Sequence, residues 1–434
     1  MKKAALHNLG CKVNAYETEA MQQMLETAGY EIVPFGEYAD VYVINTCSVT
    51  NMADRKSRQM LHRAKKLNPN AVVVAAGCYV QTSEAEVKAD AAVDLIIGNN
   101  MKHELVERLE QFWQQQGEED AFIDINEKGQ PFEELSLSHT AEHTRAFIKV
   151  QDGCNQFCSY CIIPYARGRV RSRNVENVLE EITGLAQSGY HEVVLTGIHL
   201  SSYGVDLDEN LLHLIQMVHE IPGIERIRLG SLEPRLITEE FVRELVKLPK
   251  VCPHFHLSLQ SGCDATLMRM NRKYTTAEYE EGCRVLRKYY EHPAITTDVI
   301  VGFPGENEEE FATTAAYLKR IHFYEMHIFK YSKRQGTRAA VMDNQVPEEI
   351  KTVRSAALIE LEQAMSEEFR RYYVGTTQEV LFEEPVIIDG VQMYTGYTRE
   401  YVKVAAVSDE DLSNQIRAGK IVRRLQQDLY LMEF

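Results

Sequence analysis

Long apolar runs are absent from this 434-residue chain. A helix that crosses a bilayer needs about 20 consecutive apolar residues, and no stretch approaches that length. The first residues, MKKAALHNLGCKVNAYETEA, turn polar after a very short apolar stretch, so we expect neither a signal peptide nor a membrane anchor. These absences predict a cytoplasmic protein without a membrane partner. In a reducing compartment its nine cysteines are expected to be metal ligands or buried thiols and not disulfides.

Positive charge is also scarce. There are 47 Lys and Arg against 64 Asp and Glu, and the net charge of −17 argues against a nucleic-acid partner. Three local basic stretches oppose this average, at residues 167–173, 330–338 and 417–424. Basic runs are usually solvated surface, so charge alone leaves nucleic-acid binding open.

The chain is too long for one ordinary core, and its patterns predict an α/β protein of several parts. Residues 1–113 alternate short strands with amphipathic helices, as in a parallel sheet covered by helices. Residues 114–144 are polar and acidic and are predicted to be a linker. Residues 145–372 contain six βα units, which predict a partial (β/α)6 barrel, followed by a long helix. Residues 373–434 predict a small antiparallel β-barrel.

A fourth metal ligand is missing from the most distinctive motif of the chain. Cys154, Cys158 and Cys161 form a C-x3-C-x2-C run, and the next histidine is only at His191. Three thiolates hold three irons of a cubane cluster and leave the fourth iron open. A structural zinc or cluster site needs a fourth ligand nearby, so we favour an open cluster whose free position receives a substrate or cofactor.

A second set of cysteines occurs in the N-terminal part. Cys11, Cys47 and Cys78 each follow the end of a predicted strand. Because the carboxyl ends of parallel strands share one edge of a sheet, these thiols are expected to converge. We favour a second cluster site over three separate buried thiols. The remaining cysteines lack ligand-like spacing and are interpreted as core residues: Cys252, Cys263 and Cys283.

Three cysteines at the mouth of a partial barrel resemble the radical S-adenosylmethionine (SAM) enzymes. The longer set LGCKVNAYETE, NTCSVT, GCYVQ, GCNQFCSYCIIPYARGRVRSR, SLEP, HLSLQSGCDATLMRMNRKYT, DVIVGFPGE and YSKRQGTRA resembles the methylthiotransferase family over nearly the whole chain. The resemblance implies two [4Fe–4S] clusters and SAM as cofactors. The N-terminal cysteines then hold an auxiliary cluster that carries sulfur, and the C-x3-C-x2-C cysteines hold the SAM cluster. It also implies a C-terminal TRAM domain that binds RNA.

The resemblance also implies a reaction. One SAM donates a methyl group to sulfide on the auxiliary cluster. A second SAM supplies the radical that removes hydrogen from C2 of an adenine, where the methylthio group is added. A reducing electron donor and a sulfur donor are required as partners, and the sequence identifies neither.

The SAM amino group is commonly held in the superfamily by a Gly-Gly-Glu turn. Here Thr196-Gly197 stands in that position without a glutamate, so another group is expected to serve. Candidates that end neighbouring strands are Ser231, Glu233 and Gln260.

Contacts to the adenine of SAM are expected from the fifth strand of the barrel. It keeps Ile300 and Gly302 of the usual G-x-I-x-G pattern. Asp298 replaces the first glycine, which puts adenine contacts at that position in doubt.

The substrate is suggested by the first motif. Lys-Val after the cysteine and Glu17-x-Glu19 resemble the branch that modifies N6-threonylcarbamoyladenosine (t6A) beside the tRNA anticodon. Two other substrates stay open, an isopentenyladenosine in tRNA and an aspartate of a ribosomal protein. A non-catalytic RNA-binding protein with structural clusters is a further alternative, from a different class.

Three surface and packing predictions complete the sequence picture. The arginines after Cys161 are expected to bind RNA phosphates together with the C-terminal domain. The segment MYTGYTREYVKV interleaves tyrosines with cations, which fits RNA stacking and equally fits a half-exposed strand. The long helix is expected to pack through one apolar stripe, formed by Ile350, Val353, Ala357, Leu361, Ala364 and Met365.

Overall fold

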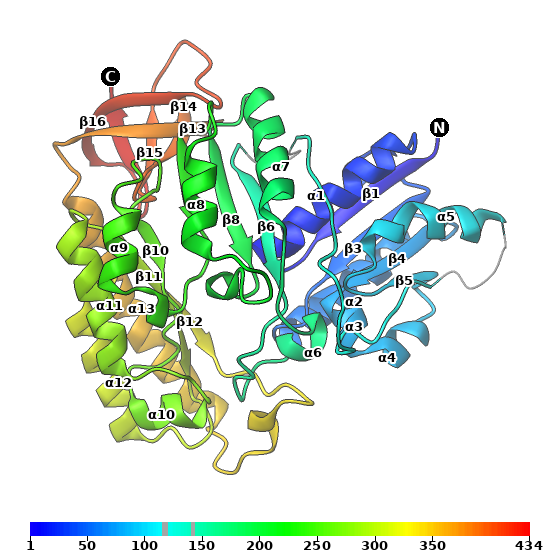
Figure 1. Ribbon diagram of the computed structural model, residues 1–434, viewed down its shortest axis with the longest axis horizontal. Coiled ribbons are helices and arrows are strands. Elements are labelled where there is room, and N and C mark those ends of the chain that lie inside the picture. Colours follow the sequence, from blue (N-terminus) through cyan, green and yellow to red (C-terminus); the bar gives the residue numbers. More distant parts are fainter. Residues whose placement is uncertain (115–119, 140–143) are drawn as a thin grey trace.

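The computed structural model describes residues 1–114, 120–139 and 144–434. Figure 1 shows the N-terminal sheet at one side of the molecule, the central strands in the middle and the C-terminal strands at the opposite end. All three parts follow the strand and helix pattern expected from the sequence.

The N-terminal part is a five-stranded parallel sheet in the order β2-β1-β3-β4-β5. Its central strands β3 and β4 are buried on both faces, as is typical of valine-rich strands in a parallel sheet covered by helices. The strands are β1 (Lys3–Asn8), β2 (Glu31–Ile32), β3 (Val41–Thr46), β4 (Val72–Gly77) and β5 (Leu95–Ile97). The helices are α1 (Lys12–Thr27), α2 (Asn51–Leu67), α3 (Cys78–Thr82), α4 (Glu84–Lys88), η1 (Lys102–Glu104) and α5 (Leu105–Gln114).

The predicted linker packs against both of its neighbours where it is described. Within the predicted linker, residues 115–119 and 140–143 lie outside the part of the chain that the structure describes. Ala121 pairs with Ile97 at the edge of the N-terminal sheet. Farther along, the backbone carbonyl of Leu135 accepts a hydrogen bond from the Tyr16 hydroxyl of α1. This segment therefore bridges the first sheet and the central part of the molecule.

The central part is a partial barrel of six parallel strands, as predicted. The strands form two sheets, in the orders β7-β6-β8-β9 and β10-β11-β12. Only β7 runs antiparallel to its neighbour. Isolated bridges between residues 227 and 251 and between residues 232 and 257 join the two sheets. The strands are β6 (Ala146–Asp152), β7 (Arg171–Ser172), β8 (Glu192–Gly197), β9 (Arg226–Leu229), β10 (His254–His256), β11 (Ala294–Val301) and β12 (Glu325–Lys330).

Helices cover the outside of this barrel and close its main core. α11 begins with a capping box, in which Thr275 and Glu278 satisfy each other's backbone amides. The helices are α6 (Ile163–Arg167), α7 (Val175–Gln187), η2 (Leu200–Ser202), α8 (Leu211–His219), η3 (Pro234–Leu236), α9 (Glu239–Leu245), α10 (Asp264–Arg269), α11 (Thr276–Tyr289), α12 (Glu308–Ile321), η4 (Arg338–Val341) and α13 (Glu348–Arg371).

The predicted apolar stripe of α13 is largely wrong. Val353 is 71% exposed and Ile350 is 41% exposed, while Met365 is the one member of the stripe that is buried. The buried face is rotated and includes two cations, Lys351 and Arg354.

Hydrogen bonds explain why α13 buries these cations. Lys351 Nζ donates to the carbonyl of Tyr331 at 3.0 Å, and Arg354 donates to Glu306 at 2.8 Å. Gly302 makes room for the lysine stem, since a Cβ atom there would lie 2.3 Å from Lys351 Cγ. An apolar pattern could not predict this face because the contacts that decide it are polar.

The C-terminal part is a closed barrel in the order β13-β14-β15-β17-β16, which confirms the predicted antiparallel-rich architecture. The first strand, β13, is continuous and has a register shift between Phe382 and Glu384 where it pairs with β14. The strands are β13 (Thr377–Ile388), β14 (Val391–Thr398), β15 (Lys403–Ala406), β16 (Ile416–Arg424) and β17 (Tyr430–Glu433).

Tyrosines of the MYTGYTREYVKV segment attach this barrel to the central part. The rings of Tyr397 and Tyr401 stack at 4.6 Å, and Arg145 lies 5.0 Å from both ring centres. Arg228 of β9 donates to the carbonyl of Arg399 at 3.0 Å. Of the two interpretations that the sequence left open for this segment, packing within the protein holds for Tyr397 and Tyr401, because their ring faces contact each other and Arg145.

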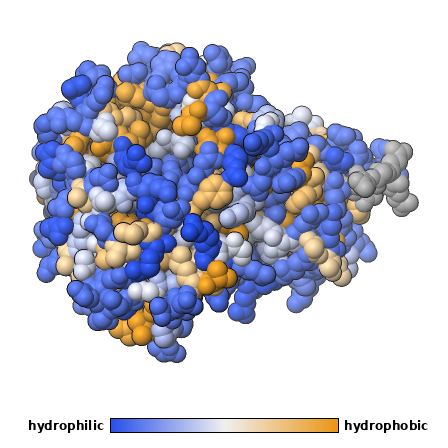
Figure 2. Space-filling view, turned by 60° about the horizontal axis from the view of Figure 1, so that its bottom comes forward, coloured by the Kyte–Doolittle hydropathy of each residue, from blue (hydrophilic) through white to orange (hydrophobic). Residues whose placement is uncertain are grey.

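The outer surface is mainly hydrophilic. Figure 2 shows hydrophilic residues over most of one face, with hydrophobic residues in scattered groups. Among the described helices, none combines the length and the apolar character that crossing a membrane requires. Strand β16 presents an exposed row of cations to solvent: Arg417, Lys420, Arg423 and Arg424.

Candidate functional site

The three N-terminal cysteines meet at one edge of the first sheet. Cys11 follows β1 and directly precedes α1, Cys47 follows β3, and Cys78 begins α3 after β4. Burial, followed by the charge of Cys78, raises the pKa of Cys47 to about 12, and Cys11 adds to this effect. All nine cysteines of the chain are free thiols. The structure therefore places the three side chains close enough for their charges to interact.

Two residues fix the loops that carry these thiols. The Asn14 side chain donates to the carbonyls of Leu9 at 2.7 Å and Thr46 at 3.0 Å, which ties the end of β1 to the end of β3. Gly10 has a positive φ of 111°, and a Cβ atom there would lie 3.0 Å from Cys47 Sγ. A side chain at position 10 would crowd the thiol.

Cys78 lies beside two polar side chains. Asn99 Nδ2 is 3.6 Å from Cys78 Sγ, and Arg167 Nε is 3.4 Å from it. Arg167 comes from α6, directly after the second cysteine motif. One arginine therefore connects the two predicted cluster sites.

The second cysteine set occupies the loop between β6 and α6. The amide of Cys154 donates to the carbonyl of Gly168 at 3.0 Å, and the amide of Cys161 donates to that of Cys158 at 3.0 Å. Burial, then the charge of Cys158, raises the pKa of Cys161 to about 12. Gly153 is required before the loop because a Cβ atom there would lie 1.8 Å from the Arg169 carbonyl oxygen.

A segment after α10 supports this loop and was not predicted to do so. Arg272 Nη1 lies 3.1 Å from Cys158 Sγ, and the Asn271 side chain donates to the carbonyl of Phe157 at 2.9 Å. The amide of Ser159 donates to the carbonyl of Met270 at 2.9 Å. These residues belong to the MNRKYT stretch of the family motif, which is the sequence signal that could have identified them.

Among the predicted SAM contacts, Glu233 makes a direct polar contact with the cysteine loop. Its carboxylate is 3.3 Å from Gln156 Nε2 and 3.4 Å from His199 Nε2. Burial by itself raises the pKa of Glu233, but the hydrogen bond and charge of His199, together with the charges of Arg272 and Arg235, outweigh it and lower the pKa below its usual value. The negative charge of Glu233 also acts on Cys154. Ser231, two residues earlier, is exposed.

Thr196 and Gly197 end β8 beside the buried Gln151. A Cβ atom on Gly197 would lie 2.7 Å from Gln151 Oε1, which also accepts the His199 amide at 2.7 Å. The Gln151 amide donates to the carbonyl of Gly153 at 2.7 Å. This chain of contacts fixes the end of β8 against the start of the cysteine loop.

Gln260 and Ile300 lie together on neighbouring chain segments. The Ile300 amide donates to the Gln260 carbonyl at 2.9 Å, and Gln260 has a positive φ of 75°. Ile300 packs in a cluster with Tyr160 of the cysteine loop. Gly302, by contrast, packs against Lys351, so its missing side chain is explained without a ligand.

A buried ion network joins the N-terminal sheet to the barrel. Arg167 and Lys149 each lie 2.7 Å from Glu17 of α1, and Lys149 lies 2.7 Å from Asp152. Burial raises the pKa of Glu17, but Arg167, Lys102 and Lys149 together hold it well below its usual range. Because each charge has buried partners of opposite sign, the network holds the two parts in one relative position.

The prediction that the arginines after Cys161 bind RNA is wrong for three of the four. Arg167 is fully buried in the network, and Arg171 lies 3.6 Å from Asp152. Arg173 is buried and pairs with Glu181. Only Arg169 among them is exposed.

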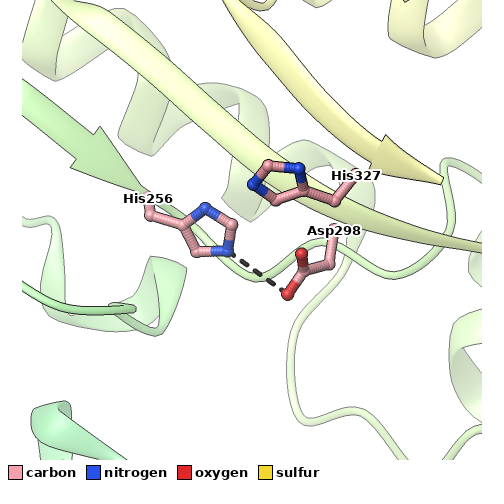
Figure 3. A group of neighbouring side chains, drawn as sticks. All are labelled: His256, Asp298 and His327. Carbon is pink, nitrogen blue, oxygen red and sulfur yellow. Dashed lines mark hydrogen bonds and ion pairs between the residues drawn. The ribbon is translucent and has the colours of Figure 1, made fainter. Parts of the chain in front are cut away.

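Three side chains from neighbouring strands point toward one another on β10, β11 and β12 (Figure 3). His256 Nε2 lies 3.3 Å from Asp298 Oδ2, and potential ligand atoms of His256, Asp298 and His327 all lie within 4.8 Å of one another. His256 Nδ1 lies 3.0 Å from the Thr296 hydroxyl. Since both nitrogens of His256 already have protein partners, we interpret these three residues as a hydrogen-bonded polar cluster and not as a metal site.

Both cysteine sets suit iron–sulfur clusters by the chemistry of their donors. Each offers three unpaired thiols, and a thiolate is the ligand that such clusters use. A partial barrel with three thiols after its first strand defines a radical-SAM enzyme. Known proteins agree: residues 148–318 match the radical SAM superfamily, and residues 3–98 match a family described as uncharacterized protein family UPF0004.

Several relatives match nearly the whole chain. It is 42% identical to threonylcarbamoyladenosine tRNA methylthiotransferase MtaB of Bacillus subtilis (strain 168), over 98% of this chain and 94% of that protein. It is 44% identical to the protein of the same name from Aquifex aeolicus (strain VF5), over 85% of this chain and 89% of that one. A tRNA-2-methylthio-N(6)-dimethylallyladenosine synthase of Thermoanaerobacter sp. (strain X514) is 37% identical, over 96% and 89%. The chain belongs to the radical-SAM methylthiotransferase family.

Solved structures support the fold. The radical SAM methyltransferase TsrM of Kitasatospora setae, with cobalamin and a [4Fe–4S] cluster bound, superposes with a TM-score of 0.58 at 15% identity. The match covers 79% of this chain and 77% of that one. Membership of the family implies a [4Fe–4S] cluster and SAM as cofactors.

Proposed function

We propose that this protein transfers a methylthio group to C2 of t6A beside the anticodon of tRNA. The observation that carries the proposal is the pair of three-thiol sites joined by Arg167, together with full-length similarity to proteins named for this activity. Cys154, Cys158 and Cys161 would hold the SAM cluster, and Cys11, Cys47 and Cys78 the auxiliary cluster. When bound, the SAM cluster with its SAM would supply the radical that removes hydrogen from C2 of the adenine, and the auxiliary cluster would supply the sulfur of the methylthio group.

The chain's own residues have separate tasks in this proposal. Glu233 takes the place of the missing Gly-Gly-Glu glutamate, because its carboxylate lies at a strand end, 3.3 Å from Gln156 of the cysteine loop. Thr196, Gly197, Ser231 and Gln260 complete the strand ends around SAM. Ile300 packs on Tyr160 and offers an apolar side chain for the adenine, whereas we assign no ligand contact to Gly302.

The RNA would be held mainly by the C-terminal barrel. Four exposed cations on β16 can neutralise phosphates, which is the general source of nucleic-acid affinity. The target base must leave its stack, since C2 of a stacked adenine is shielded by its neighbours. An electron donor and a sulfur donor act as further partners.

The nucleoside profile of cellular tRNA tests this function. In a strain that lacks the gene, we expect methylthiolated t6A to disappear and t6A itself to accumulate, as measured by mass spectrometry of digested tRNA. Restoring the gene should restore the product. Loss of methylthio-isopentenyladenosine, or loss of a methylthiolated ribosomal aspartate with normal tRNA, would contradict the proposal and assign the corresponding alternative substrate.

A further inference from the structure

Lys12 is an isolated cation beside the auxiliary cysteine site. It directly follows Cys11 and is the first residue of α1. Its side chain is accessible to solvent, and it makes no ion pair or hydrogen bond within the parts of the chain that the structure describes. A charged group held near a reactive site without a partner is available to bind a ligand.

The position of Lys12 conflicts with its local structure. Backbone amides give the start of a helix a partial positive charge, so acidic residues are favoured there and a lysine is not. The first turn of α1 contains no acidic residue that would offset this charge. Natural sequences break such local rules mainly at functional positions.

Neighbouring cations increase the local excess of positive charge. The charges that act most strongly on Lys12 are those of Arg228 and Arg145. Each arginine already has a carboxylate of its own, Glu192 at 2.8 Å and Glu383 at 2.8 Å. Glu192 and Cys11 act on Lys12 in the opposite sense but less strongly than the two arginines, so positive charge is in excess around it and an anion is favoured.

A buried hydrogen-bonding group close to Lys12 is also unused. His254 is 8% exposed, and its Nδ1 atom has no hydrogen-bond partner among the residues that the structure covers. His254, Arg145 and Arg228 all lie against the ring of Tyr401, at 5.0, 5.0 and 4.6 Å from its centre. The charges of Arg228, Lys12 and Arg145 all act on His254. Because an unsatisfied buried polar atom is costly, it indicates a ligand that supplies the missing partner.

The cysteine site itself is a less suitable anion for Lys12. Arg167 Nε already lies 3.4 Å from Cys78 Sγ, and Arg167 also acts on Cys11 and Cys47. The thiols thus have a buried countercharge of their own in Arg167. The groups that act most strongly on Lys12 are instead Arg228 and Arg145, and Lys12 in turn acts on His254.

We propose that Lys12, with His254 beside it, binds the carboxylate of the threonylcarbamoyl group and so selects t6A as substrate. This inference rests on the proposed function. The threonylcarbamoyl group ends in a carboxylate and a hydroxyl, whereas an isopentenyl group carries no charge. A lysine ammonium recognises the first and gains nothing from the second.

The pairing of Lys12 with the threonyl carboxylate is tested by removing the charge of the lysine, the charge of the carboxylate, or both. Reconstituted enzyme would be assayed with an anticodon stem-loop RNA that carries t6A, and with the same RNA in which the threonyl carboxylate is a methyl ester. The variants are Lys12→Met, Lys12→Arg and the control Lys3→Met, whose lysine lies at the opposite end of β1. Both KM and the dissociation constant of the RNA would be measured.

We expect wild-type enzyme to bind the acid roughly 10- to 100-fold more tightly than the ester, as for one hydrogen-bonded charge pair. Lys12→Met should lose this preference, with little further loss on the ester, while Lys12→Arg and Lys3→Met should keep it. Two results would overturn the inference. One is a Lys12→Met enzyme that still prefers the acid, and the other is an equal loss on acid and ester, which would indicate a role at the cluster.

The experiment separates this inference from the proposed function. If wild-type enzyme added no methylthio group to the t6A RNA, the proposed function would fail. The binding constants would still show whether Lys12 discriminates between acid and ester. Iron content and SAM cleavage without RNA, expected to be the same in Lys12→Met and wild type, control for folding.

Discussion

Replacing Cys47 with alanine is expected to abolish methylthio transfer while SAM cleavage continues, whereas replacing Cys158 with alanine should abolish both. The reason is the separation of the two thiol sites: Cys47 belongs to the N-terminal sheet and Cys158 to the loop after β6. A site that has lost one of three ligands cannot hold its cluster securely, and the other site keeps all three. Measuring 5′-deoxyadenosine and methylthiolated nucleoside in the same reaction reports on both.

Cys283→Ala is the matched control, since Cys283 is a buried core thiol of α11. It should leave both products near their wild-type levels. Methylthio product from a Cys47→Ala enzyme would contradict the two-site account. SAM cleavage by a Cys158→Ala enzyme would show that the C-x3-C-x2-C loop does not bind the SAM cluster.

Replacing Arg167 with methionine is expected to destabilise the protein strongly. The change leaves Glu17 and Asp152 buried without one of their principal cations, and breaking a buried ion pair from one side costs about 3–5 kcal/mol. The effect should appear at pH 7 in urea unfolding followed by circular dichroism. Arg169→Met is the control, because Arg169 is exposed, and surface changes are usually within about 0.5 kcal/mol.

The deficit of Arg167→Met should also depend on pH. The pKa values of Glu17 and Asp152 are lowered in the folded protein because of their cations, despite burial. Such carboxylates stabilise the fold fully above their unfolded pKa of about 4 and lose this contribution as pH falls toward the folded value. The difference between wild type and variant should therefore narrow in acid. A variant as stable as wild type at pH 7 would show that the network does not hold the parts together.

The order of elements was largely predictable, because hydrophobic periodicity is a local property. β3 and β4 are continuous apolar runs, and α11 begins with a Thr-x-x-Glu capping pattern. The buried face of α13 was not predictable in the same way. Lys351 and Arg354 are buried there by partners that precede them by 20 and 48 residues.

The candidate site residues show the same distinction between local sequence patterns and contacts made by residues far apart in the sequence. The cysteines were placed by their position after strands, which the chain reveals locally. Arg167 is buried because it pairs with Glu17, which lies 150 residues earlier in the sequence. The local basic run therefore predicted an RNA-binding surface where the structure has an internal ion network. Arg272 lies in the MNRKYT stretch of the family motif, but only the fold shows that it contacts Cys158, and no local pattern pointed to His254.

The most direct measurement of the central claim is methylthio transfer by purified enzyme in the absence of oxygen. Reconstituted protein would be incubated with SAM, a chemical reductant and an anticodon stem-loop RNA that carries t6A, and the digested nucleosides analysed by mass spectrometry. The account predicts methylthiolated t6A together with 5′-deoxyadenosine. Formation of 5′-deoxyadenosine with unchanged t6A, while the matching isopentenyladenosine RNA became methylthiolated, would contradict it.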